Sequence, residues 1–158
     1  MTTRRVRLCA AACTFALLST LAAVDAHHAS AAGNPIVPGY TLARQAVIPD
    51  LGAFRRWSVS HDLRSKTVAA VISLRRDANL LWLRASRAKP TTTTGVVARV
   101  LLLRIARDAA TLGALVDPYT QGNPARIPNR TFVIMNIAYN DAEANWRSLP
   151  TPAPAIGA

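Results

Sequence analysis

Apolar and polar residues alternate in short runs along the first half of the chain, and this pattern predicts strands. The run "WSVS" (57–60) alternates, "KTVAAVISL" (66–74) is rich in β-branched residues, and "NLLWLRA" (79–85) is apolar around Trp82. The polar stretches "HDLRS" and "RRDA" separate the three runs. Because short strands joined by tight polar breaks are typical of an antiparallel meander, we predict a small antiparallel sheet with Trp82 in its core.

The second half of the chain has a longer period, which predicts helices. In "LLLRIARDAATLGALV" (101–116), spacings of three and four residues place the apolar side chains on one arc and the charged ones on the other side. This helix should end near Gly113 or at "VDP". The apolar run 131–139 fits either a strand or a buried helix, and "NDAEANWRSL" (140–149) predicts a further helix. The expected fold class is therefore α+β, with a small antiparallel sheet followed by helices.

Proline and glycine mark the connections between these elements. Pro49, Asp50 and Gly52 predict a turn before Phe54. The composition of the remaining segments predicts an extended segment at 32–45, a linker at 88–95, a loop at 117–130 and a disordered tail at 150–158. These boundaries predict a single domain over residues 46–149.

The N-terminus has the order of a secretory signal peptide. A cationic start, "MTTRRVR", precedes an apolar run and then small residues, so we expect cleavage after Ala31, with Ala26 as a second possible position. No later segment reaches the length that a membrane span requires, and the protein is expected to be secreted. Both cysteines, Cys9 and Cys13, lie inside residues 1–31, so no disulfide and no thiolate metal site is expected after cleavage.

The chain is strongly basic, with a net charge of +11, and Lys66 and Lys89 are its only lysines. Residues 32–158 keep 16 basic and 7 acidic side chains, a net charge of +9. Such a surface attracts phosphate-rich or anionic partners through a salt-dependent field. Many exported proteins are basic without binding nucleic acid, so charge alone leaves both interpretations open.

Few side chains suggest chemistry on their own. Asp108 follows Arg104 by four residues and Arg107 by one, and an exposed pair at this spacing contributes only a few tenths of a kcal/mol. Among the histidines, His27 and His28 adjoin the cleavage region and His61 lies in a predicted loop. A copper site would need cleavage after Ala26 and a fold that brings His61 close, so we expect no metal and no cofactor.

Five segments together resemble the ribosome-inactivating proteins, which are rRNA N-glycosidases. "VIPDL", "FRRWSVSHDL" and "KTVAAVISLRRDANLLWLRA" follow one another in the family's order, "RIARDAATL" is similar to its central helix, and "AEANWRSL" is similar to a later segment. The chain is much shorter than the family domain, so the resemblance implies a large internal deletion within residues 46–149.

The resemblance implies removal of an adenine from ribosomal RNA, and hence inhibition of protein synthesis by a toxin that acts on the ribosome. An enzyme of this kind takes the base out of its stack and stabilises charge where it develops. The matched positions make Asp108 the carboxylate that stabilises the sugar cation and Trp146 the floor of the base pocket, with Glu143 three residues before it. Arg104 or Arg107 would supply the cation, because Thr111 stands where the family has its arginine.

A second hypothesis comes from the charge rather than from the resemblance. It describes a non-enzymatic secreted basic protein that binds RNA or anionic cell-envelope polymers. Such a binder should weaken steeply with salt and be insensitive to Asp108→Asn, whereas a glycosidase should lose turnover with that change. A third hypothesis, a decayed reading frame whose product barely folds, predicts a broad thermal transition.

Overall fold

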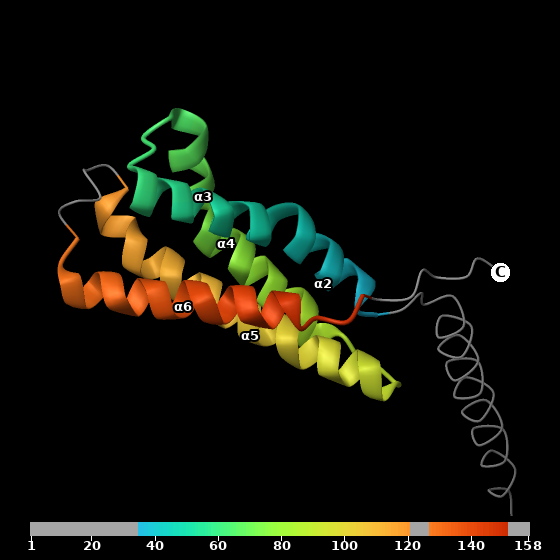
Figure 1. Ribbon diagram of the computed structural model, residues 1–158. Helices are drawn as coiled ribbons and strands as arrows, with labels where there is room; N and C mark the ends of the chain where they lie inside the picture. The colour runs from blue at the N-terminus through green and yellow to red at the C-terminus, as the bar shows by residue number, and fades with distance from the viewer. Residues whose placement is uncertain (1–34, 121–126, 152–158) are drawn as a thin grey trace, which may run out of the picture. The chain divides into compact units, whose positions relative to one another are not determined.

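The structure is a computed structural model that describes residues 35–120 and 127–151, and every regular element in these ranges is helical (Figure 1). These residues belong to one compact unit, Asn34–Ala158. Its elements in chain order are α2 (Val37–Leu42), the π-helix η1 (Ala43–Val47), α3 (Ile48–Ser60), α4 (Ser65–Arg87), α5 (Thr93–Val116), the 3-10 turn η2 (Asp117–Tyr119) and α6 (Asn129–Arg147).

The predicted α+β class is therefore wrong, because the described residues contain no strand. All three expected strands lie in helices: 57–60 ends α3, and both 66–74 and 79–85 lie within α4. The run 131–139, which fitted either element, belongs to α6. The helix predicted over 101–116 is confirmed as part of α5, which ends at Val116.

The physical reason for the error is clearest in α4, whose apolar positions have a helical period once the helix is taken as a whole. Its buried side chains include Val71, Leu74, Ala78, Leu81 and Ala85, at spacings of three and four residues. The stretch "RRDA" does not interrupt the helix, since its two arginines face solvent and its aspartate is buried. Trp82, expected in the core, is 48% exposed.

Pro49 does not produce the predicted turn. It lies in the first turn of α3, where its fixed φ is compatible with a helix. The π-helical turn η1 comes directly before α3, and the Ile48 N–H donates to the carbonyl of Ala43, five residues earlier. As a result α2, η1 and α3 follow one another without a break, and residues 37–45 are helical rather than extended.

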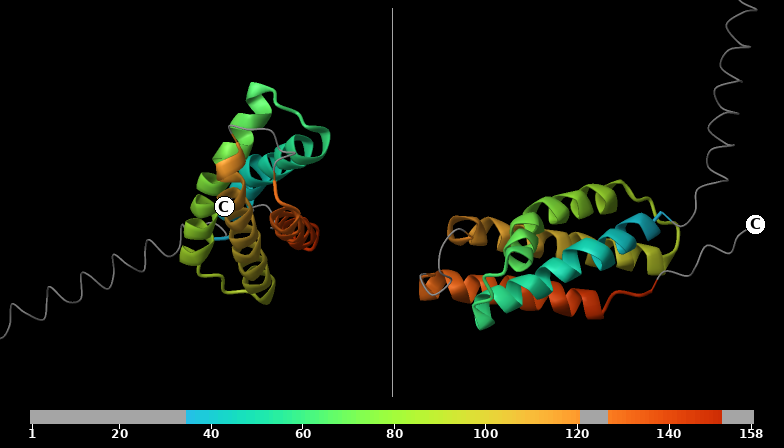
Figure 2. Two further views of the ribbon diagram at one scale, coloured as in Figure 1. Left: turned by 90° about the vertical axis from the view of Figure 1, so that its left-hand side faces the viewer. Right: turned by 90° about the horizontal axis from the view of Figure 1, so that it is seen from above.

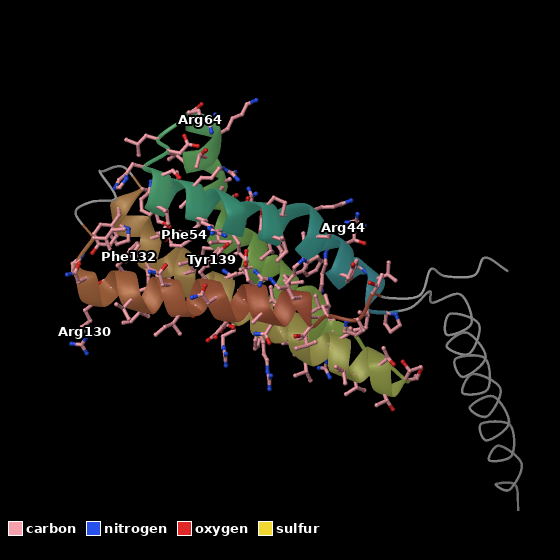
Figure 3. The ribbon with its side chains drawn as sticks, viewed as in Figure 1. Arg44, Phe54, Arg64, Arg130, Phe132 and Tyr139 are labelled. Atoms are coloured by element: carbon pink, nitrogen blue, oxygen red, sulfur yellow. The ribbon has the colours of Figure 1, made fainter. Side chains whose placement is uncertain are left out.

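The long helices pack into a bundle in which α4 and α5 make the most extensive contact, with α6 on α5 and α3 on α4 (Figure 2). Phe54 of α3 and Tyr139 of α6 point toward one another, with ring centroids 5.9 Å apart, and join those two helices (Figure 3). Trp57 is fully buried beside Phe54. Side chains of this size each contribute about 1.5–3 kcal/mol when fully buried.

The α3–α4 corner (residues 56–67) projects from the bundle, as Figures 1 and 2 show. His61 ends α3 with a left-handed backbone (φ 51°, ψ 38°), so the chain turns sharply there. Asp62 then fixes the next turn, because its carboxylate accepts hydrogen bonds from the Arg64 backbone N–H, the Arg64 guanidinium and the Thr67 hydroxyl.

Other expected boundaries are only partly described. The linker at 88–95 is cut short because α5 begins at Thr93, with the Thr92 hydroxyl accepting from the Gly95 N–H. The signal peptide (1–31), part of the loop after η2 and most of the tail at 150–158 lie outside the described residues. In the described ranges, no helix combines the length and the hydropathy needed to cross a membrane.

Candidate functional site

Asp108 lies on the inner side of α5 and is only 6% exposed. Its Oδ1 accepts a hydrogen bond from Arg107 Nε at 2.9 Å, so Arg107 is its ion-pair partner, while Arg104 is exposed and forms no ion pair within the described residues. Its Oδ2 is buried and has no hydrogen-bond partner in that part of the chain. A substrate could reach this carboxylate only if the surrounding side chains moved.

Trp146 packs between two helices, whereas the hydrogen bonds of Glu143 lie within one. The Trp146 ring packs against the ring of Tyr40, with centroids 5.4 Å apart, and so joins α6 to α2. Glu143 accepts hydrogen bonds from the Tyr139 hydroxyl and from Arg147, both on α6. Burial, together with the bond to Glu143, raises the pKa of Tyr139.

The candidate residues from the resemblance are therefore not brought together. No hydrogen bond, ion pair or ring contact in the described residues joins Asp108 to Trp146 or to Glu143. The two hollows described below are lined by other residues.

A pair of buried carboxyls lies at the contact between α3 and α4. Asp50 is 7% exposed and Asp77 is 8% exposed, and the Ser73 hydroxyl donates to Asp50 Oδ2 at 2.9 Å. Burial raises the pKa of Asp50 to about 6, and the neighbouring Asp77 adds to the shift, while the Ser73 hydrogen bond opposes it. Arg76 donates to Asp77 Oδ1 at 2.8 Å. The raised pKa of Asp50 makes folding sensitive to pH.

A shallow groove of about 600 Å³ runs along the outer face of α4. Its polar part is partly neutralised, because Asp117 of η2 forms a 3.1 Å ion pair with Arg75. The apolar part consists of side chains that are between 43% and 51% exposed. The groove is lined by Ile72, Arg75, Arg76, Asn79, Leu80, Leu83 and Asp117.

A second hollow, of about 540 Å³, lies at the α3–α4 corner and is lined by basic and hydroxyl side chains alone. We call it the corner hollow; its lining residues are Arg56, Arg64, Ser65, Lys66 and Thr67. The only acid in the corner is Asp62, and both of its carboxylate oxygens already accept hydrogen bonds from Arg64 and Thr67. These hydrogen bonds hold the pKa of Asp62 well below its usual range. The hollow therefore has an excess of positive charge at physiological pH.

Positive charge also predominates over the rest of the described surface. Residues 35–120 and 127–151 carry fifteen basic and seven acidic side chains, a net charge of +8. Five arginines form ion pairs there, and the other ten basic side chains have no acidic partner within the described ranges. Nine of those ten are exposed; the tenth, Arg99, is partly buried and donates to the carbonyls of Ala85 and Ser86.

Metal ligands are not gathered in the described part of the chain. No group of three or more histidine, cysteine, aspartate or glutamate residues is placed there to hold a metal ion. His61 lies exposed in the corner, and His27 and His28 lie outside the described residues.

The chain was compared with known proteins. No family model, no curated protein and no solved structure matches it.

Sequence reasoning did not single out the corner hollow, although the sequence contains a signal for it. "FRRWSVSHDLRSK" (54–66) places four basic side chains around one polar break, and one lysine of the chain's two is among them. The break was interpreted as a link between strands. Once 48–60 and 65–87 are recognised as two helices, the break becomes a helix–helix corner that gathers Arg56, Arg64 and Lys66.

Proposed function

We propose that the chain is a non-enzymatic protein that binds anionic cell-envelope polymers through its arginine-rich surface. The observation that carries the proposal is the corner hollow, which has no acid in its lining and three exposed cationic side chains, of which only Arg64 is paired with an acid, Asp62, within the described residues. Guanidinium and ammonium groups in such an arrangement suit phosphate oxygens, because charge-assisted hydrogen bonds to them are strong. The other exposed basic side chains supply the long-range field that attracts a polyanion.

The aromatic residues favour an envelope polymer over RNA as the partner. Proteins that bind single-stranded nucleic acid stack bases on exposed aromatic rings. In the corner, Trp57 is the only Trp, Tyr or Phe side chain, and it is fully buried. Phe54 and Tyr139 also lie in the core, and Trp146 packs on Tyr40. Trp82 is 48% exposed, but it lies fifteen residues along α4 from Thr67, about 22 Å away. The corner hollow itself therefore offers contacts to phosphate and no ring on which a base could stack.

The test is a titration of the full chain with two polymers that carry equal numbers of phosphates: base-free poly(glycerol phosphate) and single-stranded RNA. We expect the base-free polymer to bind at least as tightly as the RNA. The double variant Arg56→Gln/Lys66→Gln should raise its Kd about tenfold or more, since each basic side chain at a phosphate surface contributes about fivefold. Binding to RNA that is more than about tenfold tighter would count against the proposal and in favour of RNA.

A matched control separates the hollow from general charge. Arg44 and Arg130 are both exposed, lie far from the corner (Figure 3) and have no acidic partner in the described residues. Arg44→Gln/Arg130→Gln removes the same charge as the corner variant, and we expect it to weaken binding much less. Equal losses in the two variants would mean that net charge, rather than the hollow, governs binding.

Depurination of ribosomal RNA stays a prediction from the resemblance alone. It requires Asp108 to act on a substrate, which its burial and its pairing with Arg107 do not favour. Incubation with ribosomes, followed by aniline cleavage at any abasic site, tests it. A released fragment that disappears with Asp108→Asn would establish the enzyme and displace the binding proposal.

A further inference from the structure

Two apolar side chains are exposed at the α3–α4 corner, beside the corner hollow. Val59, in the last turn of α3, is 63% exposed, and Leu63, in the loop after it, is 55% exposed. Single exposed apolar residues are common and need no explanation. These two belong to the α3–α4 corner, which projects from the bundle (Figure 1) and which also contains the three cationic residues of the corner hollow.

The corner presents these side chains on a well-ordered turn. Asp62 joins the Arg64 backbone, the Arg64 side chain and the Thr67 hydroxyl through hydrogen bonds of 2.7–3.1 Å. The Arg64 side chain nevertheless remains 78% exposed, so it can still contact an external phosphate. Because the turn is already ordered, little conformational entropy is lost when its side chains meet a partner.

We propose that the corner surface, defined as Arg56, Val59, Leu63, Arg64 and Lys66, docks on a membrane that contains anionic phospholipids. Val59 and Leu63 enter the region between headgroups and acyl chains, while the three cations contact lipid phosphates. This combination of buried apolar area and attraction to anionic lipid is what holds proteins at a membrane interface. The inference rests on the proposed function, since the three cations that bind an anionic polymer there are the ones that contact the lipid phosphates here.

The shape and charge of the corner favour a membrane over other occupants. A projecting tip with two apolar side chains can enter a soft, flat surface, whereas an amphipathic peptide needs a groove. A second copy of the chain would bring two positively charged corners together, which costs electrostatic energy. The hollow also lies at the N-terminal end of α4, where the helix dipole adds partial positive charge.

The test is a local fluorescence measurement on the full chain, so that residues outside the described ranges do not decide it. Cys9 and Cys13 are replaced by serine, and one cysteine is introduced by Leu63→Cys and labelled with an environment-sensitive fluorophore. Ile137→Cys on α6 is the matched position, because Ile137 is 56% exposed against 55% for Leu63. The probes are vesicles of phosphatidylglycerol and phosphatidylcholine, vesicles of phosphatidylcholine alone, inorganic phosphate, and RNA.

We expect a blue shift at position 63 with the anionic vesicles and none at position 137. Neutral vesicles, phosphate and RNA should leave both positions unchanged. In the labelled chain, Arg56→Gln/Lys66→Gln should weaken vesicle binding about tenfold or more, and Arg44→Gln/Arg130→Gln much less. A similar shift at both positions, or no shift at position 63, would overturn the proposal.

Failure of this inference and failure of the proposed function are distinguishable. If the chain binds poly(glycerol phosphate) and position 63 shows no shift on anionic vesicles, the function stands and membrane docking is wrong. If it binds neither, both are wrong. A shift at position 63 with RNA and none with vesicles would assign the corner to nucleic acid.

Discussion

Asp50 lies in the contact between α3 and α4, where burial raises its pKa from 3.8 to about 6. Its folded-state pKa lies above the unfolded value, so the folded chain binds this proton more tightly. The resulting stabilisation is fully present below pH 3.8 and is lost as the pH rises through about 6. Asp62 behaves in the opposite way: its pKa is lowered, so its contribution is present above the usual pKa of an aspartate and is lost as the pH falls.

We therefore expect the chain to become more stable by about 1 kcal/mol between pH 7 and pH 5. Asp50→Asn should abolish most of this gain, because asparagine does not titrate and can still accept the Ser73 hydrogen bond. Urea unfolding at the two pH values measures the effect. Asp141→Asn, at an exposed carboxylate on α6, is the control and should leave the gain intact. An undiminished gain in Asp50→Asn would show that another group is responsible.

His61 has the only positive φ among the described non-glycine residues. A residue with a side chain is strained by about 1–2 kcal/mol in this left-handed region. Glycine avoids this strain, but its greater freedom in the unfolded state cancels part of the gain in stability. His61→Gly should therefore stabilise the fold by about 0.5 kcal/mol, seen as a higher urea midpoint with an unchanged slope. Ser60→Gly, one residue earlier in helical backbone, should lower the midpoint. A lower midpoint for His61→Gly would mean that the histidine side chain stabilises the corner.

At the scale of single residues, the sequence predicts Asp108 on the charged side of a helix, whereas the structure places it on the inner side of α5 with 6% of its surface exposed. Asp108 was correctly placed on a helix beside two arginines, yet spacing alone favoured Arg104, and the actual partner is Arg107. Spacing also cannot show that the Oδ2 of Asp108 is buried with no hydrogen-bond partner among residues 35–120 and 127–151. Both facts depend on which side of α5 faces the bundle, and that is decided by tertiary packing.

Among the helices, α4 and α5 make the most extensive contact, and they approach one another closely at Gly113. A Cβ built at Gly113 would lie 2.8 Å from the Cβ and the backbone N of Arg75 and 2.9 Å from its Cα. These atoms belong to the α4 backbone or are attached to it, so they cannot move without the helix. Alanines on both helices, including Ala78, Ala85, Ala106 and Ala109, are buried and also permit close approach.

Gly113→Ala should therefore destabilise the fold by about 2–3 kcal/mol, because α4 and α5 would have to separate. Gly52→Ala is the matched control, since the nearest atom to a new Cβ there is the flexible Arg56 Nη1 at 3.6 Å. In α3 that change should stabilise the chain by up to about 1 kcal/mol. Chemical unfolding of both variants measures the difference. Equal effects would contradict the close α4–α5 contact.

The elements show why the fold class was mispredicted. Short windows such as "KTVAAVISL" contain mostly apolar and β-branched residues, which fit a buried strand and a helix equally well. Over the whole of α4 the period of three and four residues is unambiguous, but it runs through an arginine pair that was interpreted as a break. In α5 the helical period is already visible within the single run 101–116, and the sequence predicts a helix there.

For the molecule as a whole, the helical bundle predicts a mainly α-helical far-ultraviolet circular dichroism spectrum and one cooperative thermal transition. The physical reason is that α3, α4, α5 and α6 share one core, so none of them keeps its buried face if a neighbour unfolds. A spectrum with substantial sheet would contradict the fold. A broad transition without a defined midpoint would favour the decayed reading frame instead.

The central claim is that an excess of exposed positive charge on this bundle holds an anionic polymer. The most direct test is the slope of log K for poly(glycerol phosphate) against log salt concentration, measured for the full chain. Because the three cations of the corner hollow and other basic side chains would contact phosphates, we predict that log K falls linearly with log salt concentration, with a slope steeper than about −2. Asp108→Asn should leave that slope unchanged. A slope near zero, or no binding at low salt, would contradict the account.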